Sequence, residues 1–185
     1  GTVSFGDVSA EDTTATFSVE GTYVLRLTAA DGELSAYDEV TIIVEPSSPP
    51  VEIIIDNLDA EFSTEGSWST YSSTSALHYD SDCVYAPAGD GANQAIFTPN
   101  IPTFGEYEVF VWWVRCWVCA TNAPYTVNHT GDPTTVTVNQ NDRDRAGQWN
   151  SIGTFTFNAG TSGSIVLTNN ADGRVVADAI RLVPE

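Results

Sequence analysis

The clearest structural signal in this chain is the segment Gly105-Glu-Tyr-Glu-Val-Phe-Val-Trp-Trp113. Its apolar residues recur with the period of two that is typical of a β-strand, in which successive side chains point to opposite faces of the sheet. One face of this strand carries Tyr107, Val109, Val111 and Trp113, and the other carries Glu108, Phe110 and Trp112. We expect the first set to lie in a hydrophobic core and the second to point outward, unless a long loop covers Trp112.

Short alternating runs of the same kind continue on both sides, separated by Gly, Asn, Asp and Pro, and no useful stretch has the period of a helix. Residues 51–185 contain about eight such runs, the number expected of a jelly-roll-like β-sandwich. The first of them, residues 52–57, and the last, residues 174–183, are strongly apolar, so we expect these two terminal strands to pair. The fold class predicted for the whole chain is all-β.

A domain boundary is predicted at Pro46-Ser-Ser-Pro-Pro50, because this stiff segment is unable to join a central strand. Residues 1–45 before it contain about four strands, whereas an immunoglobulin-type sandwich needs about seven. Within them, Gly21-Thr-Tyr23 is typical of a tyrosine corner, and Tyr23, Leu25 and Leu27 would share one face. We interpret this part as a partial Ig-like β-sandwich.

Residues 15–32, Ala-Thr-Phe-Ser-Val-Glu-Gly-Thr-Tyr-Val-Leu-Arg-Leu-Thr-Ala-Ala-Asp-Gly, resemble the C-terminal half of a polycystic-kidney-disease (PKD) type Ig-like domain. Such domains are spacers in secreted and surface proteins. The missing strands have two explanations. Either the domain is cut at an arbitrary boundary, or another molecule, such as a second copy of the chain, adds strands to an open sheet edge at residues 1–20.

Residues 53–183 resemble the C-terminal domain shared by golvesin and xanthan lyases, which is described as carbohydrate-binding-like. The matching motifs are, in order, Asp56-Asn57, Gly66-Ser-Trp68, Gly105–Trp113, Thr121-Asn-Ala-Pro-Tyr-Thr126, Val138-Asn-Gln140, Trp149-Asn-Ser-Ile-Gly153 and Ala177-Asp-Ala-Ile-Arg181. The resemblance implies a β-sandwich at the end of a large secreted protein. It brings no agreed ligand residues, and Cys116-Trp-Val-Cys119 departs locally from the pattern.

The net charge of −19 arises from 25 acidic residues against six arginines, with no lysine. Such a surface disfavours nucleic acid and anionic membranes, and no apolar run is long enough for a membrane-spanning helix. Met is absent, so we expect the chain to be a piece of a longer extracellular or cell-surface protein.

No set of residues has the pattern of a catalytic site. The chain contains two histidines, lacks the Gly-x-Ser-x-Gly elbow, and has so many acids that carboxylate pairs arise by chance. We therefore expect no enzyme activity.

The three cysteines are Cys83, Cys116 and Cys119, which do not have the spacing of a structural zinc site. In an oxidising compartment we expect one disulfide. It either joins Cys83 to Cys116 or Cys119 across two strands, or closes the tight Cys116–Cys119 loop.

Aromatic residues are the best ligand-binding candidates, because flat rings stack on the C–H faces of sugars while polar side chains orient the hydroxyl groups. One possible platform consists of Trp112, Trp117 and Tyr125 together with Asn122 and Arg115. The alternative for Trp112 is burial under a loop. Trp68 and Trp149 are expected to pack rather than bind.

Two aspartates, Asp56 and Asp178, lie on the terminal strands that should pair, where oxygen ligands suit a structural Ca²⁺. The alternative is that each carboxylate is satisfied by backbone N–H groups or by Arg181. A weaker calcium candidate combines Asp80 and Asp82 with Asp90. No other cofactor is indicated.

Two functions fit these observations. The first is a non-catalytic carbohydrate-binding or adhesion module of a larger protein, whose partner is a polysaccharide or cell-surface glycan. The second is a structural subunit of an extracellular fibre or surface layer, assembled by strand complementation of the partial Ig-like domain.

Overall fold

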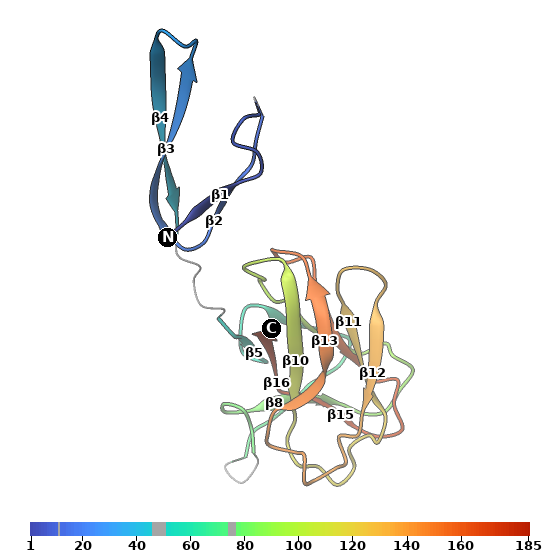
Figure 1. Cartoon of the computed structure of the whole chain (residues 1–185). Helices are drawn as coiled ribbons and strands as arrows, with labels where there is room; N and C mark the ends of the chain where they lie inside the picture. Colours follow the sequence, from blue (N-terminus) through green and yellow to red (C-terminus); the bar gives the residue numbers. More distant parts are fainter. Residues whose placement is uncertain (11, 46–50, 74–76) are drawn as a thin grey trace. The chain divides into compact units, whose positions relative to one another are not determined.

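The computed structural model describes residues 1–10, 12–45, 51–73 and 77–185, and they form strands and loops without any helix (Figure 1). The chain divides into two units, Gly1–Pro49 and Pro50–Glu185. The predicted linker at residues 46–50 lies outside the described residues. In the described part of the chain, no helix is long and apolar enough to cross a membrane.

The first unit contains two antiparallel pairs, β1 (Val3–Phe5) with β2 (Ala15–Phe17) and β3 (Gly21–Ala30) with β4 (Ser35–Val44). The Tyr23 hydroxyl donates a 2.7 Å hydrogen bond to the Val19 carbonyl, which is the bond expected of a tyrosine corner. None of the described residues in this unit is fully buried. These residues therefore enclose no core.

The described residues of the second unit form twelve strands in three sheets. The four-stranded sheet has the order β13 (Asn150–Phe157), β10 (Gly105–Trp112), β16 (Ala179–Pro184), β5 (Ile53–Asp56). The five-stranded sheet has the order β12 (Thr134–Val138), β11 (Ala123–Asn128), β14 (Ser164–Thr168), β9 (Gln94–Phe97), β6 (Phe62–Glu65). The small sheet has the order β15 (Val175–Ala177), β8 (Cys83–Ala86), β7 (Ser69–Tyr71).

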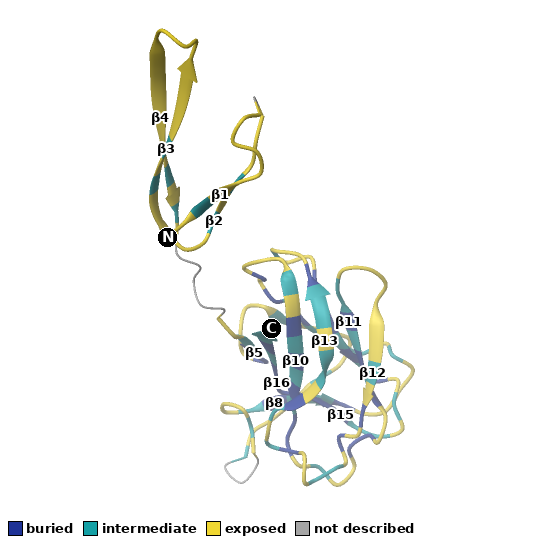
Figure 2. Ribbon diagram, viewed as in Figure 1, coloured by how far each residue is buried: buried dark blue, intermediate teal, exposed yellow. Residues whose placement is uncertain are grey.

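The two larger sheets contribute to one continuous core, in the arrangement of a β-sandwich (Figure 2). Strand β10 is central to it, since Tyr107, Val109 and Val111 on this strand, and Trp113 directly after it, are each at most 1% exposed. The terminal strands β5 and β16 pair with Ile55 opposite Ile180. Both the inward face of the 105–113 strand and the pairing of the terminal strands are thus confirmed.

Candidate functional site

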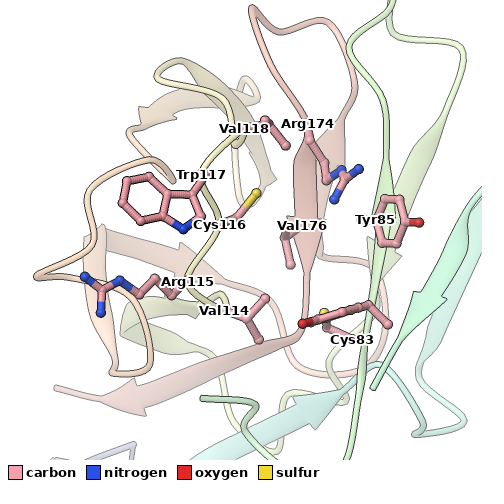
Figure 3. Close-up of a pocket in the computed structure, with 10 residues that line it drawn as sticks. Cys83, Tyr85, Val114, Arg115, Cys116, Trp117, Val118, Arg174 and Val176 are labelled. Atoms are coloured by element: carbon pink, nitrogen blue, oxygen red, sulfur yellow. The ribbon is translucent and has the colours of Figure 1, made fainter. Parts of the chain in front are cut away.

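A pocket of about 250 Å³ opens where the small sheet meets the chain that leaves β10 (Figure 3). Strands β7 and β8 contribute one wall, residues 114–118 a second, and the start of β15 a third. The lining residues are Tyr71, Cys83, Tyr85, Val114, Arg115, Cys116, Trp117, Val118, Arg174 and Val176. Most of this surface is apolar or aromatic, and the only charged side chains among the described lining residues are Arg115 and Arg174.

Trp117 is presented on the short loop that a disulfide between Cys116 and Cys119 closes. This loop is also fixed by backbone hydrogen bonds to the beginning of β15, from Arg174 N–H to the Val118 carbonyl at 2.9 Å and from Ala120 N–H to the Arg174 carbonyl at 2.7 Å. The indole of Trp117 is nevertheless 79% exposed. Of the disulfide pairings that the sequence left open, the structure contains Cys116–Cys119. Cys83 is a free, buried thiol.

Three of the six arginines gather around this loop. The guanidinium of Arg174 stacks on the Tyr85 ring, 4.2 Å from its centre, and that of Arg143 lies over the Trp117 ring. Desolvation and, next, the nearby charge of Arg115 lower the pKa of Arg143. None of these three arginines forms an ion pair with a carboxylate in the described part of the chain, although the sequence contains 25 acidic residues. The two charged side chains that line the pocket are thus both positive, on a molecule whose net charge is strongly negative.

The predicted platform is only partly assembled. Arg115 and Trp117 line the pocket. Trp112 does not, because its indole N–H donates to the Leu77 carbonyl at 2.8 Å and its ring packs edge-on against Tyr79 and Trp149. Trp112 is thus half-buried beside Leu77, Tyr79 and Trp149, which is nearer to the alternative of cover by a loop than to an open platform.

Tyr125 and Asn122 also have structural positions rather than positions in the pocket. Tyr125 is 1% exposed, and its hydroxyl accepts a 3.0 Å hydrogen bond from Gln140. Asn122 accepts a hydrogen bond from the Asp172 N–H at 2.8 Å and so fixes the turn before β15. A sugar is unable to stack on Tyr125 in this conformation, which removes it from the platform.

Sequence reasoning missed Tyr85 and Arg174 as pocket residues. Tyr85 has a weak signal, since it follows Cys83 by two positions and so shares its face of β8. Arg174 has none, because its place beside Tyr85 depends on the pairing of β15 with β8 across some ninety residues of sequence.

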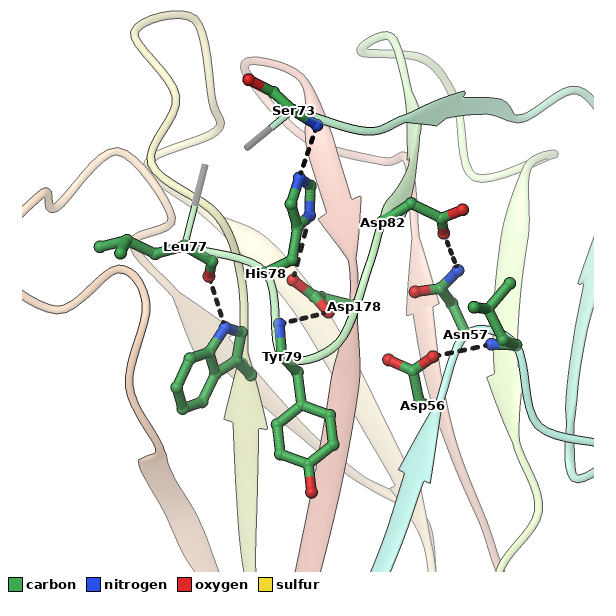
Figure 4. Close-up of polar contacts among 10 residues, drawn as sticks. Asp56, Asn57, Ser73, Leu77, His78, Tyr79, Asp82 and Asp178 are labelled. Atoms are coloured by element: carbon green, nitrogen blue, oxygen red, sulfur yellow. Dashed lines mark hydrogen bonds and ion pairs between the residues drawn. The ribbon is translucent and has the colours of Figure 1, made fainter. Parts of the chain in front are cut away.

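A second polar region surrounds Asp56 and Asp178 (Figure 4). One oxygen of each carboxylate accepts a backbone N–H, from Leu58 at 3.0 Å for Asp56 and from Tyr79 at 3.2 Å for Asp178. The other oxygen of each is buried without a hydrogen-bond partner in the described structure. Arg181 does not reach them and instead lies 3.6 Å from Glu52. A backbone N–H group thus provides a hydrogen bond to one of the two oxygens of each carboxylate.

Burial raises the pKa of Asp178 to about 8, and the like charges of Asp56, Asp82 and Asp80 add to the effect against the hydrogen bond from Tyr79. Burial likewise raises the pKa of Asp56. Among the described residues, neither carboxylate forms an ion pair with an arginine. The calcium site at Asp56 and Asp178 stays a prediction.

The weaker calcium candidate is not assembled in the described residues. Asp82 accepts a hydrogen bond from Asn57 at 2.7 Å, and Asp90 accepts one from the Ala92 N–H in the turn before β9. No group of three possible metal ligands in the described part of the chain includes Asp80, Asp82 or Asp90.

Comparison with known proteins places this fold in a family. The model of the golvesin C-terminal domain matches residues 53–184. The chain is 37% identical over 147 residues to a xanthan lyase of Bacillus sp. (strain GL1), covering 76% of this chain but 16% of that protein. The chain thus spans about a sixth of the length of this relative.

Solved structures agree with this placement. A xanthan lyase from Paenibacillus superposes with a TM-score of 0.69 at 35% identity, over 80% of this chain and 14% of that one. A family 35 carbohydrate-binding module from Cellvibrio japonicus gives a TM-score of 0.53 at 12% identity over 72% of this chain and 93% of that one. A family 35 module from Clostridium thermocellum gives a TM-score of 0.51 at 14% identity, over 71% of this chain and 98% of that one. At this identity the two modules show a shared β-sandwich fold. The chain belongs to the golvesin C-terminal domain family.

Proposed function

We propose that this chain is a non-catalytic carbohydrate-binding module of a larger extracellular or cell-surface protein, and that its pocket binds an acidic saccharide. The observation that carries the proposal is the group of unpaired arginines beside an exposed tryptophan. Trp117 offers a flat apolar face to a sugar ring, and Arg115 and Arg174 offer forked N–H donors to a carboxylate. The likeness to carbohydrate-binding modules and to a polysaccharide lyase supports the sugar as ligand class.

Charge supports an acidic rather than a neutral ligand. In a chain of net charge −19, cations without carboxylate partners stand out, because any acidic side chain nearby would be attracted to them. An external anion supplies the missing partner. A uronic acid residue combines such a carboxylate with the C–H face that an indole recognises.

The described lining residues of the pocket also lack the two groups, carboxylate and imidazole, that most often act as general acid or base. Its described lining residues contain no carboxylate and no histidine, and Cys83 is buried in surroundings that raise the pKa of its thiol. This composition suits binding.

Affinity electrophoresis tests the proposal, with native gels that contain polygalacturonate, its highly methyl-esterified form, xanthan or a neutral galactomannan. The runs use about 0.15 M salt, where a Debye length of about 8 Å screens the repulsion between the acidic protein and a polyanion. We expect retardation by the acidic polymers and little by the esterified one. Equal retardation by esterified and free polygalacturonate would contradict an acidic ligand, and no retardation by any polymer would contradict sugar binding.

A second candidate, a structural subunit assembled by strand complementation, is favoured by one observation in the first unit. The β3–β4 register places Tyr23, Leu25, Leu27, Val40 and Ile42 on one face. Leu27 is 77% and Val40 is 52% exposed. An added sheet would cover this face. Size-exclusion chromatography coupled to light scattering, with calcium present, tests this function. Polymers would support it, and a monomer at high concentration would contradict it.

A further inference from the structure

One cluster of side chains, which borders the sugar pocket and shares Cys83 with it, has the composition of a transition-metal site. His78, Cys83 and Asp178 each offer one ligand atom, and these three atoms lie within 4.8 Å of one another. The side chains of His78 and Asp178 are 3% and 0% exposed, and Cys83 is 1% exposed. The cluster is therefore enclosed by protein, at the junction where the small sheet meets the end of β5.

Among the described residues, two of the three ligand atoms have no hydrogen-bond partner, and their one polar contact is with each other at ion-pair distance. His78 Nδ1 and Asp178 Oδ2 are buried without a hydrogen bond in the described structure, and they lie 3.9 Å apart, which is too far for a direct hydrogen bond. Figure 4 shows the imidazole and the carboxylate facing each other across this gap. Buried polar atoms of this kind are rare and call for a partner that is missing from the protein itself.

The carboxylate is already oriented for such a partner. The backbone N–H of Tyr79 donates to its Oδ1 at 3.2 Å, so its Oδ2 is directed at His78. Cys83 adds a sulfur atom, and its thiol is not needed elsewhere because Cys116 and Cys119 are bonded to each other. Asp56, Asp80 and Asp82 lie close enough to add negative potential, which favours a cation in this cluster.

We propose that His78, Cys83 and Asp178 form a binding site for one divalent transition metal of the zinc class. A sulfur, a nitrogen and an oxygen ligand suit zinc, whereas Ca²⁺ takes about six to eight oxygen ligands. Zinc bonds of about 2.0–2.3 Å hold tetrahedral ligand atoms roughly 3.5 Å apart. The 3.9 Å between His78 Nδ1 and Asp178 Oδ2 is near that value.

Metal binding changes one contact. The Ser73 N–H donates to His78 Nε2 at 3.3 Å, which leaves the imidazole proton on Nδ1 in the neutral ring. With a metal on Nδ1, the imidazole proton moves to Nε2, and the hydrogen bond from the Ser73 N–H is lost. At 3.3 Å it is longer than most N–H hydrogen bonds, so the loss is small beside the new metal bonds.

Cobalt(II) titration of the chelator-treated 185-residue chain, without reductant, tests the site directly. Cys83 is then the only thiol, so a thiolate-to-cobalt charge-transfer band reports this cluster alone. We expect the band to saturate at one equivalent, to persist in excess Ca²⁺ and to disappear on adding Zn²⁺. The absence of the band in the folded wild-type chain would overturn the proposal, as would stoichiometric Ca²⁺ binding that prevents it.

Substitutions separate the ligands from their surroundings. H78A, C83S and D178N should each weaken Zn²⁺ binding at least tenfold in competition with a chromophoric chelator, and C83S should abolish the cobalt band. The matched control H129A removes the other histidine and should change neither. Unchanged affinity in H78A and D178N, with circular dichroism like the wild type, would contradict the site. The wild-type cobalt spectrum remains decisive should a variant fail to fold.

Discussion

The guanidinium carbon of Arg174 lies 4.2 Å from the centre of the Tyr85 ring. Because this stacking holds the cation on the wall of the pocket, the side chain is partly ordered before any ligand arrives, and binding then costs less conformational entropy. Tyr85→Leu should keep the apolar wall but release Arg174. We expect binding of oligogalacturonate to weaken several-fold with little change in melting temperature, as measured by calorimetry and thermal unfolding. Equal affinity in this variant would mean that the stacking has no part in binding.

Two tryptophans should respond in opposite ways to truncation. Trp117→Ala removes an exposed ring, so we expect at least a tenfold loss of saccharide affinity, about 1.4 kcal/mol, with an unchanged melting temperature. Trp112→Ala removes a ring that packs against Tyr79 and Trp149 and donates to Leu77, so it should destabilise the fold by ~3 kcal/mol. Its saccharide affinity at low temperature should stay near that of the wild type. The reverse pattern would return Trp112 to the binding surface.

The disulfide should matter more for binding than for stability. It closes a loop of only a few residues, which restricts the unfolded chain less than a long loop would, while it fixes the position of Trp117. In a Cys116→Ser/Cys119→Ser double variant we expect weaker saccharide binding and a small change in the denaturation midpoint. A double variant with full affinity would show that the loop needs no covalent closure.

Gln140 should be a strong contributor to stability although it is polar. It is 1% exposed, donates to the Val176 carbonyl at 2.7 Å and accepts from the Val176 N–H at 2.9 Å. Gln140→Ala leaves the Val176 N–H buried without its partner and the Val176 carbonyl with only the 3.5 Å bond from the Tyr125 hydroxyl, so we expect a loss of ~2–4 kcal/mol in urea unfolding. Gln148→Ala, at an exposed position with one hydrogen bond, should cost less than about 1 kcal/mol. Similar losses for the two variants would contradict this role of Gln140.

A hydroxyl-to-carbonyl hydrogen bond is repeated in the two units. Tyr107 donates to the Thr103 carbonyl at 2.9 Å, as Tyr23 does to the Val19 carbonyl. Tyr107→Phe should lower the free energy of unfolding of the second unit by ~1 kcal/mol, because the ring stays in place while the bond is lost. The control Tyr37→Phe alters an exposed ring in the first unit and should leave that transition unchanged. No effect of Tyr107→Phe in urea unfolding would show that its hydroxyl bonds water equally well.

The faces of β10 could be predicted from sequence because burial on one side of a strand imposes a strict alternation, and Val109, Val111 and Trp113 follow it. The same rule applied to β11 would have placed Tyr125 inside, since Ala123, Tyr125 and Val127 recur at every second position and all are buried. Its assignment to a binding platform neglected that signal.

The covering of Trp112 and the composition of the pocket were beyond such rules. The Leu77 carbonyl reaches Trp112 from 35 positions away, and Arg174 meets Tyr85 only through the pairing of β15 with β8. The residues around a side chain in the sequence do not determine which distant loop or strand packs against it. A cluster such as His78, Cys83 and Asp178 is hidden for the same reason.

The most direct test of the sugar-binding account is calorimetric titration with an oligogalacturonate and with its methyl ester at about 0.15 M salt, for the wild type, Arg174→Gln and the control Arg26→Gln. The account predicts that the wild type and Arg26→Gln bind the free acid at least tenfold more tightly than the ester, and that Arg174→Gln loses this preference. Arg26 pairs with Glu39 in the other unit, so its loss changes the net charge equally without touching the pocket. Equal binding of acid and ester by the wild type, or an unchanged preference in Arg174→Gln, would contradict it.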